Sequence, residues 1–148
     1  MKALILAFFS LCIISSVYAS GPFTLSDIER IHIFVKNDSE LFDDKDVEKL
    51  KERLSRLVQT LGLKAEGRDA PTLMLKIESI SDKNKHYLYV KLALGEDIIT
   101  KRKSGTKVFA LTYDASDFIE SEEPKKDLLE SVEFLTDEFI SHFKDDNE

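Results

Sequence analysis

The sequence predicts an α+β domain in which a four-stranded mixed sheet carries two helices on one face. Three observations support this fold class. Apolar and polar residues alternate with a period of two over residues 28–36, 72–81 and 86–114, as expected for strands with one buried face. Residues 44–61 and 124–143 carry apolar residues at helical spacing. The elements follow the order β-α-β-β-β-α, and one apolar face per helix favours packing of both helices on the same side of the sheet.

The first strand is predicted over residues 28–36 and ends in the polar cluster 37–40. The first helix is predicted to begin at Asp43 or Asp44, because aspartate caps a helix well and acids in the first turn suit the helix dipole. Gly62 supplies its C-terminal stop. The segment that follows, residues 64–70, is predicted to be a charged loop.

The second strand is predicted over residues 72–81, and the polar turn 82–85 makes it antiparallel to the third strand. A β-α-β crossover would make the first and second strands parallel neighbours. Residues 115–123 are predicted to form a loop. Acids followed by Pro124 then mark the start of the second helix, which is predicted to end near residue 143, before a frayed polar tail.

The clearest strand pattern lies in the hairpin predicted over residues 86–113. Gly95 and the two acids after it predict a β-bulge or a tight turn. The bulge is favoured, because residues 98–103 then continue toward a clean turn. Ser104-Gly105 predicts the turn, because glycine tolerates the positive φ of a short connection. The return strand, residues 106–114, is apolar on both faces and is therefore predicted to lie inside the sheet. The two faces of the preceding strand are Leu88, Val90, Leu92 and Leu94, expected toward the core, and Tyr87, Tyr89, Lys91 and Ala93, expected outward.

Residues 1–19 have the pattern of a secretory signal peptide. Lys2 precedes an apolar run, and Val17-Tyr18-Ala19 fits cleavage after Ala19. The apolar run, residues 3–14, is shorter than the roughly 20 residues that a membrane span needs. The residues before Cys12 form a poor lipobox. We therefore expect a single exported domain over residues 20–148, in the periplasm or secreted.

The composition indicates the cellular compartment of the protein and disfavours one class of partner. Cys12 is the single cysteine and leaves with the signal peptide, so about 130 residues must be held by a hydrophobic core without disulfides. This absence, with a composition rich in lysine, glutamate, isoleucine and phenylalanine, favours a bacterial periplasm. The formal net charge is −7, and cleavage removes one lysine and no acid. The acidity disfavours nucleic acid as a partner.

The order of elements behind an export signal resembles that of small α/β proteins of the bacterial envelope, a group that includes the lipopolysaccharide-assembly lipoprotein of the outer membrane. The resemblance covers residues 28–143 and concerns the order of elements alone. The chain departs from the lipoprotein pattern because it lacks a lipobox before Cys12. Since the two share no sequence motif, no binding residue is carried over.

The sequence contains no motif for catalysis, a cofactor or a metal. His32, His86 and His142 are far apart, and the acids at residues 43–46 lack the glycine and closing glutamate of a calcium loop. No G-x-S-x-G occurs, and the five glycines are not clustered as in a phosphate-binding loop. We therefore expect a non-enzymatic protein without cofactor or metal. The alternative is a small periplasmic enzyme or enzyme inhibitor whose site is not visible as a motif.

Two surfaces are candidate binding sites. The sheet face away from the helices is predicted to expose an aromatic patch that binds a partner protein or an envelope lipid, made of His32, Phe34, Met74, Tyr87 and Tyr89. The alternative is that loop 115–123 folds over this face. The basic cluster at the hairpin turn is predicted to contact lipid phosphates or an acidic partner: Lys101, Arg102, Lys103 and Lys107. Its alternative role is to solubilise the tip and prevent edge pairing. The partner's identity and the oligomeric state are left open.

Overall fold

The computed structural model describes residues 24–83 and 85–148, so the predicted signal peptide, with Cys12 and the cleavage site, lies outside the described residues. The described part is an α+β fold with two helices and one mixed sheet, as predicted, but the sheet has five strands rather than four. The elements are β1 (Arg30–Asp38), α1 (Asp44–Thr60), β2 (Lys64–Ala65), β3 (Thr72–Asp82), β4 (Lys85–Ile99), β5 (Lys107–Ser121) and α2 (Pro124–Asn147).

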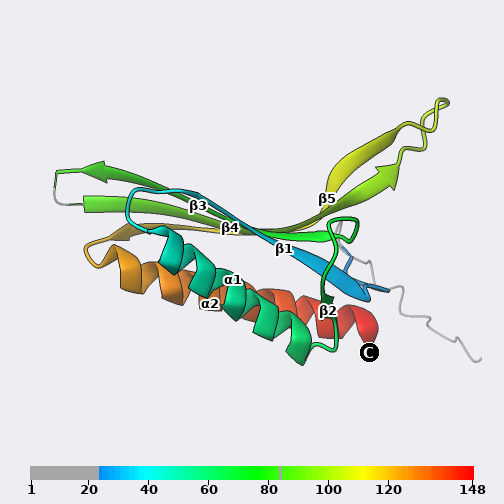
Figure 1. The fold of residues 1–148 in the computed structure, drawn as a ribbon. Helices are drawn as coiled ribbons and strands as arrows, with labels where there is room; N and C mark the ends of the chain where they lie inside the picture. The colour runs from blue at the N-terminus through cyan, green and yellow to red at the C-terminus, as the bar shows by residue number, and fades with distance from the viewer. Residues whose placement is uncertain (1–23, 84) are drawn as a thin grey trace, which may run out of the picture.

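The strands lie in the order β2-β1-β3-β4-β5. β1 runs parallel to both β2 and β3, whereas β3, β4 and β5 are antiparallel neighbours. The parallel β1–β3 pair and the antiparallel β3–β4 pair confirm the predicted pairings. Both helices lie on one face of the sheet, and the described residues leave most of the opposite face uncovered (Figure 1). We call this opposite side the open face.

The hydrophobic core fills the space between the helices and the sheet. Alternate residues of the central strands are buried, and they include Leu73, Leu75 and Ile77 of β3 and Leu88, Val90, Leu92 and Leu94 of β4. They pack with buried residues of both helices: Leu50, Leu54 and Val58 of α1, and Leu128, Val132, Leu135 and Phe139 of α2. The register predicted for residues 88–94 is therefore confirmed. Ala93 is fully buried although it lies on the open face, where it pairs with the larger residues Met74 and Asp114.

Both ends of α1 follow from local sequence chemistry. The Asp43 side chain accepts a hydrogen bond from the Asp46 backbone N–H at 2.9 Å, which makes Asp43 the N-cap. Gly62, with φ of 77°, donates to the Gln59 carbonyl, and the Leu63 N–H donates to the Val58 carbonyl. These two bonds form a Schellman motif, so Gly62 ends the helix as predicted.

β5 differs most from the prediction. It covers Lys107–Ser121, and the segment predicted to be loop 115–123 is strand up to Ser121. This segment extends the sheet instead of folding over the open face. Pairing along the whole length of β4 outweighs the weak strand propensity of the intervening aspartates and serine. The interior position predicted for this strand is wrong, because β5 is an edge strand. It exposes three large apolar residues: Phe109, Leu111 and Phe118.

The bulge predicted at Gly95 is present between β4 and β5. Leu94 pairs with Tyr113 but Gly95 pairs with Leu111, so the extra residue is Thr112 on β5. The register shift exchanges the faces of β5 beyond this point.

Past the bulge, β4 and β5 leave the rest of the sheet as a two-stranded arm (Figure 1). β3 begins at Thr72, opposite Gly95, so the arm has no third strand beside it. The arm closes in a turn where the Gly105 N–H donates to the Arg102 carbonyl at 2.8 Å and Gly105 has φ of 57°. The predicted hairpin turn is confirmed.

Two segments predicted to be irregular belong to regular elements. Lys64–Ala65, inside the predicted loop 64–70, pairs with Arg30 and Ile31 as β2. The predicted polar tail is the last turn of α2, which holds the segment before β1 in place. Its Asp146 Oδ2 accepts from the Leu25 N–H at 2.6 Å, and its Asn147 Nδ2 donates to the Leu25 carbonyl at 3.1 Å. The Leu25 side chain is buried in the core.

Candidate interaction surface on the open sheet face

Cross-strand pairing arranges the side chains of the open face in rows across the sheet. One row is Phe34, Met74, Ala93 and Asp114. The next is a row of lysines, Lys36, Lys76 and Lys91, which ends at Ser116. The third is Asp38, Glu78, Tyr89 and Phe118, and beyond it Tyr87 pairs with Ile80 and Glu120. The lysine row thus separates two groups of apolar side chains on the open face.

The five residues predicted to form one aromatic patch lie on this face in two groups. Phe34 and Met74 pair directly, and His32 is two residues before Phe34 on β1. Tyr87 and Tyr89 lie nearer the other end of the sheet, beyond the lysine row. The structure therefore separates the predicted patch into two parts.

Four residues at the second end form what we call the aromatic cluster: Ile80, Tyr87, Tyr89 and Phe118. The rings of Tyr87 and Phe118 stack with centroids 6.3 Å apart and an interplanar angle of 17°. Phe118 is 69% exposed and Ile80 is 71% exposed. The cluster lines a shallow hollow of about 440 Å³, together with Asp38, Glu78 and Ser79. Such a hollow has room for an apolar anchor residue of a partner.

Phe118 and Ile80 were missed by the sequence prediction. Phe118 belongs to the segment predicted to be a loop, and Ile80 is the last apolar residue before a polar turn. A signal for Phe118 exists, because Ala115 and Ile119 alternate with Ser116, Phe118 and Glu120 at strand spacing. Asp117, which falls on the same side of the strand as Ala115 and Ile119, obscured it.

The lysine row places three ammonium groups on neighbouring strands, an arrangement that is unfavourable without counter-charges. The hydrogen bond from Lys76 to Glu78 raises the pKa of Lys76, so this lysine is cationic at neutral pH. Lys85 and Glu120 form a further ion pair beside the aromatic cluster, which raises the pKa of Lys85. Each lysine of the row has an acidic partner: Lys36–Asp38 at 2.8 Å, Lys76–Glu78 at 2.7 Å and Lys91–Asp114 at 2.8 Å.

The predicted anion contact lies at the tip of the arm. Lys101, Arg102 and Lys103 are exposed and make no ion pair within the part of the chain that the structure describes. Lys107 differs, because its Nζ lies 2.6 Å from Asp97. The tip follows the end of β4 at Ile99, whereas the aromatic cluster lies near its start. Ten residues of strand separate Tyr89 from Ile99, roughly 30 Å, so the two surfaces are distinct sites.

The described residues, 24–83 and 85–148, contain no group of three or more histidine, cysteine, aspartate or glutamate side chains that could hold a metal ion. In the same part of the chain, neither helix combines the length and the apolar character needed to cross a membrane.

No protein-family model matches the chain, and no curated protein matches its sequence.

Proposed function

We propose that the protein is an exported, non-enzymatic binding protein and that its aromatic cluster docks a partner protein. The observation that carries this proposal is the stacked Tyr87–Phe118 pair on a sheet face that no described element covers. Aromatic residues are enriched at the centres of protein interfaces, where they supply large contact areas at a low entropic cost. Exposed apolar groups gathered in one place are characteristic of interaction sites.

The charges around the aromatic cluster favour a protein over a lipid surface. Carboxylates of Asp38 and Glu78 line the hollow, and their ion pairs with Lys36 and Lys76 leave no excess positive charge there to attract an anionic membrane. The nearby ion pairs Lys36–Asp38 and Lys85–Glu120 place both signs of charge at its border. A mixed polar rim around an apolar centre is the usual anatomy of a protein–protein interface.

Export is supported by the signal-peptide pattern of residues 1–19. The absence of cysteine after Cys12 agrees with a periplasmic domain that needs no disulfides. The non-enzymatic assignment rests on the lack of catalytic sequence motifs.

Site-specific photo-crosslinking tests the proposal. A photo-reactive benzoyl-phenylalanine replaces Phe118 in one protein and Phe134 in a matched control, which is 59% exposed on α2. In cells of the source organism, we expect a covalent adduct with one defined protein at Phe118 and none at Phe134. The captured protein is then purified and its affinity measured. The double variant Tyr87→Ser/Tyr89→Ser should bind it at least tenfold more weakly, while Phe134→Ser binds it like the wild type.

Circular dichroism melting separates lost binding from lost folding. Because Phe118 is 69% exposed, Phe118→Ser should keep the fold and still weaken binding even if the double tyrosine variant is unstable. If the mass of the adduct identifies a lipid, the ligand of the aromatic cluster is a lipid and not a protein. A folded Phe118→Ser variant that binds the captured protein with unchanged affinity would overturn the proposal.

A further inference from the structure

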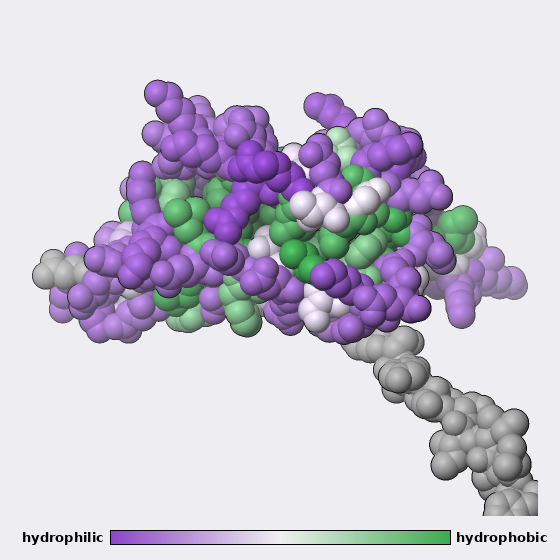
Figure 2. Space-filling model, turned by 90° about the horizontal axis from the view of Figure 1, so that it is seen from below, coloured by the Kyte–Doolittle hydropathy of each residue, from purple (hydrophilic) through white to green (hydrophobic). Residues whose placement is uncertain are grey.

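A groove runs between the two helices, on the opposite side of the molecule from the open face. α1 packs on β1 and β2, whereas α2 packs on β4 and β5, so the helices are held apart over the middle of the sheet. The groove has a volume of about 360 Å³. Seen from the helical side, hydrophobic residues gather along the middle of the molecule between hydrophilic borders (Figure 2). The volume lies within the range of small-molecule sites, roughly 300–1,000 Å³.

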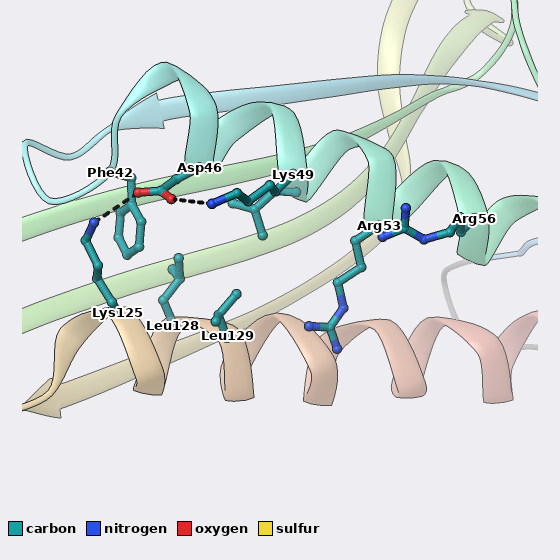
Figure 3. A pocket seen from close by; sticks show the side chains of 9 residues that line it. Phe42, Asp46, Lys49, Arg53, Arg56, Lys125, Leu128 and Leu129 are labelled. Carbon is teal, nitrogen blue, oxygen red and sulfur yellow. Dashed lines mark hydrogen bonds and ion pairs between the residues drawn. The ribbon is translucent and has the colours of Figure 1, made fainter.

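The lining of the groove is apolar at its centre. Leu50 of α1 and Leu128 of α2 are buried there, and Phe42 lies at one end (Figure 3). Leu129 lines the same space and is 45% exposed, so an apolar ligand would remove its side chain from water.

Two ion pairs cross the groove from helix to helix. Lys125 Nζ of α2 lies 3.0 Å from Asp46 of α1, and Arg53 Nη2 of α1 lies 3.2 Å from Glu133 of α2. Asp46 and Arg53 are seven residues apart on α1, which corresponds to about 10 Å along the helix. The apolar centre therefore lies between two polar crossings.

The groove carries one positive charge in excess when the ion-pair partners Glu52 and Glu133 are counted with its lining residues, although the formal net charge of the chain is −7. The lining residues include four basic residues, Lys49, Arg53, Arg56 and Lys125, and a single acid, Asp46. Asp46 is shared by two of them, because Lys49 lies 3.5 Å from it and Lys125 lies 3.0 Å from it. Excess positive charge beside an apolar surface is complementary to an anion that carries a hydrocarbon chain.

Arg53 and Arg56 are best placed to bind the anionic group. They are three residues apart on α1 and both line the groove, where Arg53 reaches toward α2 and Arg56 lies along α1 (Figure 3). The Arg56 pair with Glu52 is long, at 3.7 Å, and its side chains are 68% and 62% exposed, so it holds the guanidinium weakly. Guanidinium groups bind carboxylates and phosphates through two parallel hydrogen bonds.

We propose that this groove binds a single-chain anionic amphiphile of the fatty-acid class. Its carboxylate is held by Arg53 and Arg56, and its chain lies over Leu50, Leu128 and Leu129 toward Phe42. The carboxylate takes the place of the Glu133 and Glu52 side chains on the two guanidinium groups. This site is independent of the aromatic cluster, because the two lie on opposite faces of the sheet.

Calorimetric titration with dodecanoate, below its micellar concentration, tests the proposal. We expect saturable binding of one molecule per chain. Dodecyltrimethylammonium, which has the same chain and the opposite charge, should bind at least tenfold more weakly, and acetate, which has the charge without the chain, should not bind measurably. Equal binding of the anionic and cationic chains would show adsorption to apolar surface alone and would overturn the proposal. Binding of acetate as tightly as dodecanoate would reduce the site to a plain anion site and would also overturn it.

Matched variants locate the site. Arg53→Gln/Arg56→Gln should weaken dodecanoate binding at least tenfold, whereas Lys126→Gln removes an exposed cation of α2 outside the groove and should leave it unchanged. Leu129→Ser should weaken binding, with Phe134→Ser of α2 as its control. Both arginine side chains are more than a third exposed, so their replacement should preserve the fold. Unchanged dodecanoate affinity in the arginine variant would contradict the assignment. NMR chemical-shift changes on adding dodecanoate that appear at the backbone amides of Tyr87 and Tyr89, and not at those of α1, would also contradict it.

Discussion

The ring of Phe109 on β5 occupies the space that a side chain at Gly95 of β4 would need. A Cβ atom at Gly95 would overlap two atoms of that ring and lie 3.3 Å from a third. Gly95 pairs with Leu111 and Phe109 pairs with Asp97, so the ring reaches diagonally across the two strands at the bulge. An aromatic ring over a strand glycine supplies packing that the glycine itself lacks. The pair lies where the arm leaves the sheet.

Gly95→Ala should therefore destabilise the protein by displacing the Phe109 ring. We expect a loss of about 1 kcal/mol or less in the free energy of unfolding, because the Phe109 ring is 61% exposed and can move away from the strand. Urea denaturation measures it. The double variant Gly95→Ala/Phe109→Ala should lose less than the sum of the two single variants, because removing the ring removes the clash. Additive losses would mean that the two residues do not interact.

Leu92→Ala should test the core under the helices. Leu92 is fully buried, and its truncation should cost about 2–5 kcal/mol because it leaves a cavity. Lys91→Ala, one residue earlier, removes an open-face side chain whose ion pair with Asp114 is partly exposed, and should cost about 1 kcal/mol or less. Denaturant melts of the two variants give the comparison. Equal losses would contradict the assignment of the two residues to opposite faces.

The sequence predicted those parts of the fold whose signals are local and strong. The Asp43 cap and the Gly62 stop set both ends of α1, and uninterrupted alternation set the register of residues 88–94. The bulge at Gly95 was also predicted, because glycine and two acids interrupt a clear pattern. Each of these features depends on neighbours in the chain, so a single sequence contains the information.

The features that the sequence prediction missed depend on contacts between distant residues. Residues 115–121 are strand because β4 offers a long pairing partner, and β2 exists because Arg30 and Ile31 lie beside Lys64 and Ala65. The same limit applies to the candidate sites. The helix groove combines Arg53 and Leu129 from two helices, and no spacing within one segment predicts their proximity.

The ion pair between Asp46 and Lys125 should make part of the stability depend on pH. The hydrogen bond from Lys125, with the attraction of Lys125 and Lys49, holds the pKa of Asp46 below its ordinary value of 3.8. The folded state therefore binds this proton more weakly than the unfolded state does. The stabilisation is present above pH 3.8 and is lost as the pH falls through the lower folded value.

Asp46→Asn should consequently lower the urea midpoint near neutral pH, and the difference from wild type should vanish in strong acid, at about pH 2. Asp44→Asn is the control, because Asp44 lies in the same first turn and makes no ion pair within the described residues. A difference that persists in acid would show that Asp46 acts through its hydrogen bond with the Asp43 backbone rather than through its charge.

The three exposed cations at the tip of the arm should attract anionic surfaces despite the negative charge of the whole chain. Lys101, Arg102 and Lys103 make no ion pair within the described residues, and each cation near an anionic membrane contributes about 1 kcal/mol. Replacing all three with glutamine should therefore weaken co-sedimentation with phosphatidylglycerol vesicles by roughly two orders of magnitude at low ionic strength, and should reduce its dependence on salt.

Lys107→Gln should have a smaller effect, because Lys107 is already paired with Asp97 at 2.6 Å. Vesicles of phosphatidylcholine alone measure the contribution of the exposed apolar residues of the arm, Ile99 and Phe109. If the triple variant binds anionic vesicles as tightly as wild type while keeping its melting temperature, the cations serve only to solubilise the tip and block pairing at the sheet edge.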